Sequence, residues 1–367
     1  MSLLTFSFAL FIFDFVAYSI SICLIVAIFA KTRFEAHLLL LSGAVSLILR
    51  SSCRYSATFY TDPNNEFFLL FWRVSYFFLF IAVFIIMNSI LLNSYDELPF
   101  YTHIFGVICG ILIFSYFNED WINPVYSNDL KMWYGEYELI PLILFLILSM
   151  IFLTNITVPV ISKIKRDGFT KNGNLYFVWL GLVLILSWGI TANAPNEELL
   201  GKVRLFFLPL GILIYSIGHF KDPFIISYSK TKPKMLFISN TRGKILLNYN
   251  FEKNIYKEYG DLSGLLAGVN SVLNEIMQRK IKEGKERVID RGEEKVIILG
   301  VKNLIAFLIV PSAKKMLVAS LYLLLRKIND LLTEEDLKKE LTKEKQKIAC
   351  TLIEETINPL LEMKEED

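Results

Sequence analysis

Three charged residues lie within long apolar stretches of the first hundred residues, namely Asp14, Arg50 and Arg73. An ionisable side chain at membrane depth is costly to bury, so each is a default candidate for a functional site. Asp14 lies about ten residues into the first stretch, roughly 15 Å deep at the rise of an α-helix. An ion pair of Asp14 with Arg50 or Arg73 can therefore form in the outer half of a helical bundle.

Functional and structural interpretations of this candidate cluster are open. It either lines a pocket for a small ligand at the outer half of the bundle, or it ties helices together. Another purely structural interpretation, instead of a tie, is that the arginine side chains extend along apolar surface toward lipid headgroups. Arg54 lies one helical turn beyond Arg50 and approaches the same outer face.

Seven apolar stretches precede residue 222, and a bilayer core of about 30 Å requires roughly 20 residues of helix. The chain is 54% hydrophobic and its mean hydropathy is +0.47, which is too apolar for an ordinary soluble protein. The second and fourth stretches are the weakest, so six spans is the alternative to seven. The predicted spans are 4–30, 36–57, 67–92, 101–118, 138–161, 175–193 and 203–221.

The distribution of Lys and Arg predicts an outer N-terminus and a cytoplasmic C-terminus, because short cytoplasmic connections carry an excess of these residues. With this orientation the inner connections hold ten of them and the outer connections five; the connection 93–100, with only Asp96 and Glu97, is the misfit. We therefore expect a multi-pass protein of the cell membrane, embedded in a lipid bilayer.

Several kinds of chemistry are disfavoured by the sequence. A net charge of +2 argues against nucleic acid as the main partner. With three histidines and no CxxC or HExxH pattern, neither a metal nor another cofactor is expected. No nucleophile or acid–base pair has a recognisable neighbour, so we do not expect an enzyme. The seventh stretch has no central lysine for a retinal Schiff base, and no histidine follows His219 to serve as a kinase phosphoacceptor.

The chain changes character after residue 222 and becomes charged and alternating. A short basic linker, 223–234, separates a membrane domain, 1–222, from an α+β domain, 235–332, and a charged C-terminal helix, 333–367. Alternation of apolar residues at period two predicts a strand at 245–251. Short apolar runs bounded by turns predict further strands at 235–239, 288–290, 296–301 and 304–310. Helical spacing predicts helices at 261–280, 314–332 and 334–362. The order is β-β-α-β-β-β-α-α, a five-stranded antiparallel sheet with helices on its faces.

This element order resembles the longin domain, within the longin, roadblock and profilin-like group. The start of the 261–280 helix, Asp261-Leu262-Ser263-Gly264-Leu265-Leu266, is similar to that of archaeal longin-like modules, and the first helix of roadblock domains has no counterpart before Met235. The resemblance implies an interaction module that forms dimers and platforms for small GTPases. It transfers no site residue, because the contacts of this group are surfaces without a fixed motif.

We therefore expect a receptor-like membrane signalling protein whose cytoplasmic longin-like domain recruits a partner such as a small GTPase, and which can pair with a second copy. The alternative is a membrane anchor that scaffolds a GTPase or trafficking complex without sensing a ligand. A transporter with a regulatory domain ranks lower, because the stretches show no duplication and few carboxylates.

Overall fold

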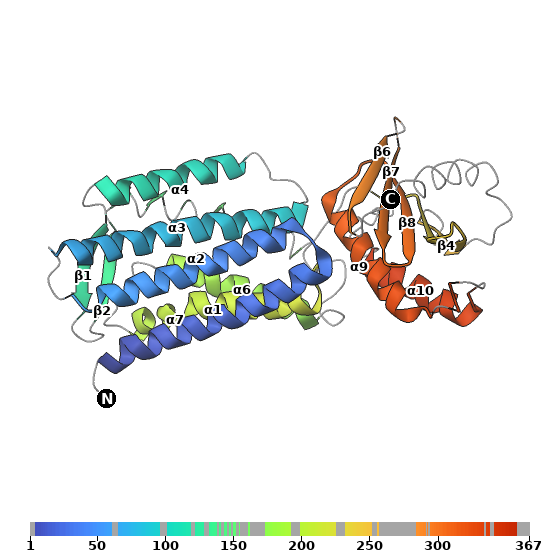
Figure 1. Ribbon diagram of the computed structural model, residues 1–367. Coiled ribbons are helices and arrows are strands. Elements are labelled where there is room, and N and C mark those ends of the chain that lie inside the picture. The colour runs from blue at the N-terminus through green and yellow to red at the C-terminus, as the bar shows by residue number, and fades with distance from the viewer. Residues whose placement is uncertain are drawn as a thin grey trace. The chain divides into compact units, whose positions relative to one another are not determined.

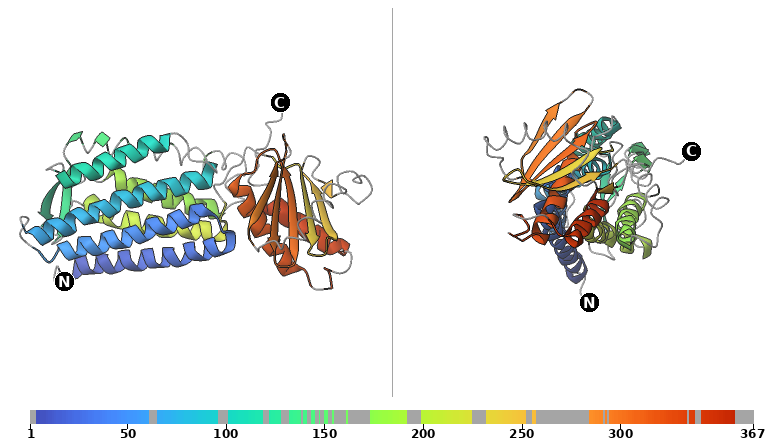
Figure 2. Two further views of the ribbon diagram at one scale, coloured as in Figure 1. Left: turned by 45° about the horizontal axis from the view of Figure 1, so that its top comes forward. Right: turned by 90° about the vertical axis from the view of Figure 1, so that its right-hand side faces the viewer.

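Two units make up the chain in the computed structural model, Met1–Ala30 with Glu35–Ile226 and Lys31–Phe34 with Ser227–Asp367. We call the first the membrane unit and the second the sheet unit (Figures 1 and 2). Besides Gly292 and scattered positions in 139–161, the structure describes residues 4–60, 65–95, 101–118, 122–127, 132–137, 173–191, 199–224, 232–251, 255–256, 284–290, 294–333, 335–337 and 341–357.

Long helices form the membrane unit, and they follow the predicted apolar stretches. They are α1 (Leu4–Thr32), α2 (Glu35–Ala57), α3 (Glu66–Tyr95), α4 (Tyr101–Asn118), α6 (Gly173–Ile190) and α7 (Leu199–Lys221). Most of the predicted span 138–161 lies outside the described residues.

Three of these helices, α1, α2 and α3, are long and apolar enough to cross a membrane. The other apolar helical stretches among the described residues are shorter, namely Thr102–Phe114, Asn174–Trp188 and Leu205–Lys221. The structure therefore supports a membrane-associated protein with three clear spans. It does not establish the seven-helix bundle expected from the sequence, because the apolar stretches described in α4, α6 and α7 are shorter than a bilayer span.

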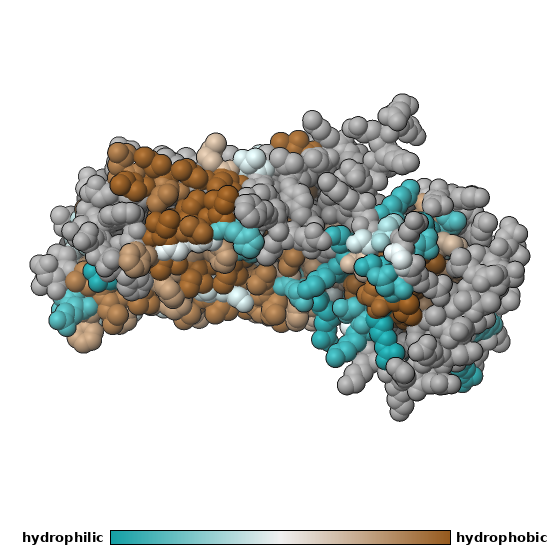
Figure 3. Space-filling view, turned by 90° about the horizontal axis from the view of Figure 1, so that it is seen from above, coloured by the Kyte–Doolittle hydropathy of each residue, from teal (hydrophilic) through white to brown (hydrophobic). Residues whose placement is uncertain are grey.

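The outer surface of the membrane unit is apolar, as lipid contact requires. On α1 the side chains of Ile12, Phe15 and Ile20 are exposed, whereas those of Tyr18 and Ile25 are fully buried. Among the described residues, large exposed hydrophobic side chains occur almost entirely in this unit, and they form a broad apolar surface in Figure 3. Apolar residues on both sides of the helices indicate a membrane environment on the outside and a packed core within.

Small residues allow two of the helix pairs to pack closely. A Cβ atom on Gly181 of α6 would lie 2.6 Å from the backbone nitrogen of Tyr215 and 2.7 Å from the carbonyl oxygen of Gly211, both on α7. In the α2–α3 pair, the Ser89 hydroxyl donates to the Ala36 carbonyl over 2.6 Å. Close backbone approach at small residues and interhelical hydrogen bonds are the usual means of helix association in membranes.

The structure contains a β-hairpin between α4 and α6, where the sequence predicted no strand. Its strands, β1 (Ile122–Ser127) and β2 (Met132–Tyr137), pair antiparallel. Trp133 of β2 is buried against Phe68 of α3, and its indole nitrogen donates to the Tyr60 carbonyl over 2.9 Å. The hairpin is thereby fixed to the α2–α3 connection.

The sheet unit is a six-stranded antiparallel sheet with the strand order β5-β4-β3-β8-β7-β6. Its strands are β3 (Met235–Asn240), β4 (Ile245–Asn250), β5 (Ile255–Tyr256), β6 (Glu286–Asp290), β7 (Lys295–Val301) and β8 (Leu304–Val310). Five of them match the predicted strands, and β5 is a two-residue edge strand that the sequence did not indicate. The predicted 261–280 helix lies outside the described residues.

Both faces of the central strands are buried, so these strands are apolar on both sides, whereas the edge strand β6 is mostly exposed. One face packs against helix α9 (Lys315–Leu331), which buries Leu317, Leu321, Leu324 and Ile328 as its helical stripe predicted. The opposite face carries a separate buried apolar cluster of Phe237, Val296, Ile298, Ile305, Phe307 and Ile309. The central strands β3, β7 and β8 therefore form the core of the unit.

The C-terminal helix is shorter than predicted. Helix α10 spans Lys343–Thr356, and its N-cap is Thr342, whose hydroxyl accepts from the Lys345 backbone N–H. Before it, Thr333 and Asp336 cap a separate turn through reciprocal hydrogen bonds. These local side-chain bonds satisfy backbone groups outside a helix, which is why the predicted 334–362 helix is interrupted.

Replacement of Gly181 by Ala should destabilise the membrane unit by about 1–3 kcal/mol, because the added methyl forces α6 and α7 apart. The measurement is unfolding of the full chain in detergent followed by tryptophan fluorescence. Gly110→Ala is the matched control, since no atom lies within 4 Å of the place that its methyl group would occupy. Equal stability of both variants would contradict the tight α6–α7 packing.

The cap residue Asp336 predicts an acid-sensitive contribution to the stability of the sheet unit. Hydrogen bonds from Lys345 and Thr333 lower the pKa of its carboxyl group to about 2, below its usual 3.8. The stabilisation is therefore complete above about pH 4 and is lost as the pH falls toward 2. The urea midpoint, followed by far-UV circular dichroism, should be lower for Asp336→Asn than for wild type at pH 6, and the gap should close near pH 2.

The matched control for this experiment is Asp330→Asn, since Asp330 forms an ion pair with Lys302 over 3.6 Å and both side chains are exposed. Exposed pairs contribute little, so this variant should follow wild type at every pH. A gap for Asp336→Asn that persists unchanged to pH 2 would contradict the assigned hydrogen bonds.

Candidate functional site within the membrane unit

A buried hydrogen bond joins the first two helices of the membrane unit. The hydroxyl of Ser51 on α2 donates to Asp14 Oδ2 on α1 over 2.8 Å. Asp14 is 7% exposed and Ser51 is 5% exposed, so the contact is shielded from both lipid and water. A hydrogen bond to an ionised acceptor is stronger than one between neutral groups. The contact therefore sets the relative register of α1 and α2.

Arginine residues of α2 supply positive charge beside Asp14. Arg50 and Arg54 are the cations whose charges act on the Asp14 carboxylate. Arg50 is 8% exposed, and its guanidinium carbon lies 5.5 Å from the ring centroid of Trp188 on α6. Such a cation–π contact is strongest when water is excluded. The polar cluster of Asp14, Ser51 and Arg50 thus connects α1, α2 and α6.

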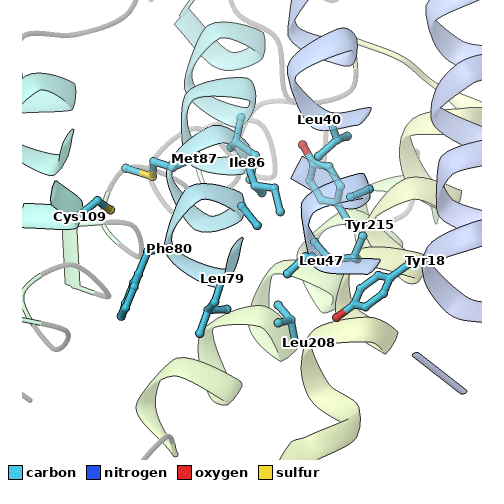
Figure 4. Close-up of a cluster of buried hydrophobic side chains, with 14 of the residues drawn as sticks. Tyr18, Leu40, Leu47, Leu79, Phe80, Ile86, Met87, Cys109, Leu208 and Tyr215 are labelled. Carbon is cyan, nitrogen blue, oxygen red and sulfur yellow. The ribbon is translucent and has the colours of Figure 1, made fainter. Parts of the chain in front are cut away.

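Two polar atoms of α1 are buried beside this cluster without a hydrogen-bond partner among the described residues, Asp14 Oδ1 and the hydroxyl of Tyr18. Tyr18 lies one helical turn from Asp14, so both side chains occupy one face of α1. In Figure 4 the Tyr18 hydroxyl points inward, toward Leu47 and Leu208. An unpaired buried polar atom costs about 1–3 kcal/mol. Such atoms are rare in native proteins and often mark an unseen water, ion or ligand.

Arg73 does not join the cluster. It is half-buried on α3 and forms no hydrogen bond or ion pair in the described part of the chain. Helices α2 and α3 are antiparallel, with Ala36 opposite Ser89, so Arg73 lies near the level of Ser51 and Asp14 but contacts neither of them. Of the three candidate residues, the structure thus brings Asp14 and Arg50 together, and it leaves Arg73 apart.

A second buried polar group lies where α7 ends. His219 Nδ1 lies 3.3 Å from the carbonyl oxygen of Pro223, and His37 of α2 also hydrogen-bonds to the Pro223 backbone. Proline has no N–H group, so its carbonyl oxygen accepts from both rings. Both rings are buried and their centroids are 6.3 Å apart. This histidine clasp (His37, His219 and Pro223) fixes the course of the chain directly after α7.

Sequence reasoning missed several of these residues. Tyr18 could have been found from its spacing of four residues from Asp14, and Ser51 from its position directly after Arg50. No comparable signal identifies Trp188 or His37, because their roles depend on which helices are neighbours.

The described residues offer no obvious metal centre, since no three of their His, Cys, Asp and Glu side chains lie together. The cluster instead offers one carboxylate, one guanidinium and one hydroxyl group, and Tyr18 beside it adds a second hydroxyl. Such a set can bind a ligand through hydrogen bonds and charge.

No protein-family model, curated protein or solved structure matches the chain. Functional inference therefore rests on the geometry of the cluster and on the fold of the two units.

Tyr18→Phe should leave the ligand-free protein as stable as wild type or stabilise it by up to about 1–3 kcal/mol, because the substitution removes a buried hydroxyl without a partner. The measurement is the denaturation midpoint of the full chain in detergent. Tyr249→Phe in the sheet unit is the matched control. There the hydroxyl donates to Glu354 over 3.3 Å, so its loss should destabilise that unit by about 0.5–1.5 kcal/mol. A marked loss of stability on Tyr18→Phe would show that the hydroxyl is satisfied.

Proposed function

We propose that this protein is a receptor-like membrane signalling protein. The observation that carries the proposal is the buried polar cluster, in which a carboxylate keeps one oxygen unpaired although a guanidinium lies nearby. A purely structural polar network is most stable when every member is satisfied. Ionisable residues inside a membrane unit are candidates for a functional site, and a ligand could supply the partners that this network lacks.

The proposal includes seven spans with an outer N-terminus and a cytoplasmic C-terminus in the cell membrane. Helices α4, α6 and α7 and the 138–161 segment would complete the set begun by α1, α2 and α3. The excess of Lys and Arg in the proposed inner connections supports this orientation. It puts the polar cluster in the outer half of the unit, nearer to the external solution than to the cytoplasm.

The sheet unit supplies the output in this proposal. An antiparallel sheet followed by two helices, α9 and α10, agrees with the element order that resembles a longin domain. The longin-like interpretation favours a cytoplasmic protein as partner, specifically a small GTPase, and a second copy of the chain as another. The role is recruitment, without catalysis or a cofactor.

Helix α7 provides the route between site and output. Its first half packs beside α1 through Phe206 and Phe13, whose ring centroids are 5.2 Å apart, and its last turn ends in the histidine clasp. A ligand that alters the helix contacts around Asp14 would shift α7 and, through Pro223, the chain that leads to β3. A ligand acts this way only if it binds the two positions of α7 with different affinity.

One observation favours the alternative of an anchor without a ligand. The Asp14–Ser51 hydrogen bond would hold α1 and α2 together even if nothing else bound there. Under this alternative the cluster contributes stability alone, and the sheet unit scaffolds its partner constitutively.

Asp14→Asn separates the two functions because it removes the charge and keeps an acceptor for Ser51. We expect at least about a fivefold change in nucleotide-dependent capture of a small GTPase, the lower end of typical allosteric coupling energies. The measurement uses full-length protein in lipid nanodiscs, a lysate supplied with GDP or a non-hydrolysable GTP analogue, and identification by mass spectrometry.

Glu66→Gln is the matched control, since it removes an equal charge from an exposed position at the start of α3. It should capture as wild type does. If wild type captures a small GTPase and Asp14→Asn does so equally well at normal folded level, the cluster is structural and the anchor is the better account. If wild type captures none in either nucleotide state, the proposed partner class is wrong.

A further inference from the structure

Arg50 and Asp14 are opposite charges that share a buried site but do not satisfy one another. Among the described residues, the Arg50 guanidinium forms no ion pair and no hydrogen bond, and its one contact of note is with the ring of Trp188. Asp14 forms no ion pair there either, and only its Oδ2 atom has a hydrogen-bond donor. Leaving charges unpaired at low dielectric costs several kcal/mol per ion.

The polar atoms of Asp14, Arg50 and Tyr18 that have no hydrogen-bond partner among the described residues define the chemistry that a ligand of this site would need. Arg50 has planar N–H donors that match a carboxylate or another oxyanion. Asp14 Oδ1 requires a donor, preferably a cationic one. The Tyr18 hydroxyl, one turn along α1, can give or accept one further hydrogen bond.

We propose that this cluster binds a small water-soluble zwitterion, with its carboxylate on Arg50 and its ammonium group on Asp14. This inference rests on the proposed receptor function and names the ligand class of the same site. A simple cation would face Arg50 and Arg54, and a simple anion would face the Asp14 carboxylate. A molecule that carries both charges pairs with each and leaves neither buried charge unsatisfied.

The depth of the cluster favours a soluble molecule over a lipid headgroup. Asp14 lies about ten residues from the start of α1, roughly 15 Å along the helix axis, whereas headgroups lie at the ends of spanning helices. A phosphatidylethanolamine headgroup carries the same pair of charges, however, and the test must separate the two sources.

The test uses the full chain in phosphatidylcholine nanodiscs, whose headgroup has no N–H donor. The probes are the L-amino acids, betaine and 4-aminobutyrate, screened by thermal shift and measured by calorimetry. For each amino acid that binds, or for 4-aminobutyrate, the N-acetyl and methyl ester forms remove one charge at a time, and betaine tests a zwitterion without an N–H donor. We expect at least one zwitterion with a free ammonium group to bind, and both blocked forms to bind at least tenfold more weakly, since hydrogen bonds to charged groups contribute about 1.5–3 kcal/mol.

Asp14→Asn and Arg50→Gln should each weaken that binding at least tenfold. Their matched controls are Glu66→Gln and Arg73→Gln, because these residues lie outside the cluster, and both should bind as wild type does. Tyr18→Phe provides a folded variant within the site and should weaken binding about three- to tenfold, the equivalent of one neutral hydrogen bond.

Several outcomes would overturn the proposal. Binding of no probe would do so, as would equal binding of an N-acetyl form, which would indicate an anion site. Stabilisation by phosphatidylethanolamine in the nanodisc, with no response to soluble probes, would assign the site to a lipid headgroup. If no zwitterion binds and Asp14→Asn still alters capture of the GTPase, only the ligand class fails. If a zwitterion binds and capture never changes, the receptor function fails and the site remains.

Discussion

The cost of placing charge inside a membrane unit governs the structure around Asp14. A carboxylate removed from water must find hydrogen bonds or an opposite charge close by. Ser51 supplies one hydrogen bond and α2 supplies two cations, so α1 and α2 can pair only in the register that brings these groups together. The positions of Tyr18 and Trp188 around the cluster follow from that register.

The packing of the remaining helices depends on small residues more than on polar ones. Gly181 and Gly211 allow the backbones of α6 and α7 to approach closely. This close pair of helices carries Trp188, on α6, and Phe206, on α7. Lipid gives no hydrophobic drive for helices to associate, so this close fit and the few buried hydrogen bonds determine the arrangement. The sheet unit, in contrast, is held by a conventional apolar core beneath α9.

Element positions were predictable from the sequence because they are local, whereas contacts between distant segments were not. Apolar runs located the helices of the membrane unit, and short apolar runs between turns, with period-two alternation in β4, located five strands of the sheet unit. The β1–β2 hairpin escaped prediction because it is stabilised by Trp133 on Phe68, and the C-terminal helix was drawn too long because two short capping motifs interrupt it. In the site, Asp14 and Arg50 were found from depth alone. Arg73 was grouped with them because depth gives the level of a residue but not the helix face it shares.

Hydrogen–deuterium exchange on the full chain in nanodiscs, comparing wild type with Asp14→Asn, tests the coupling between cluster and output most directly. The account predicts altered exchange at the end of α7, at the histidine clasp and in β3, far along the chain from the substitution. Altered exchange confined to α1 and α2, with α7 and β3 unchanged, would contradict a signalling role and leave the cluster as a tie between two helices.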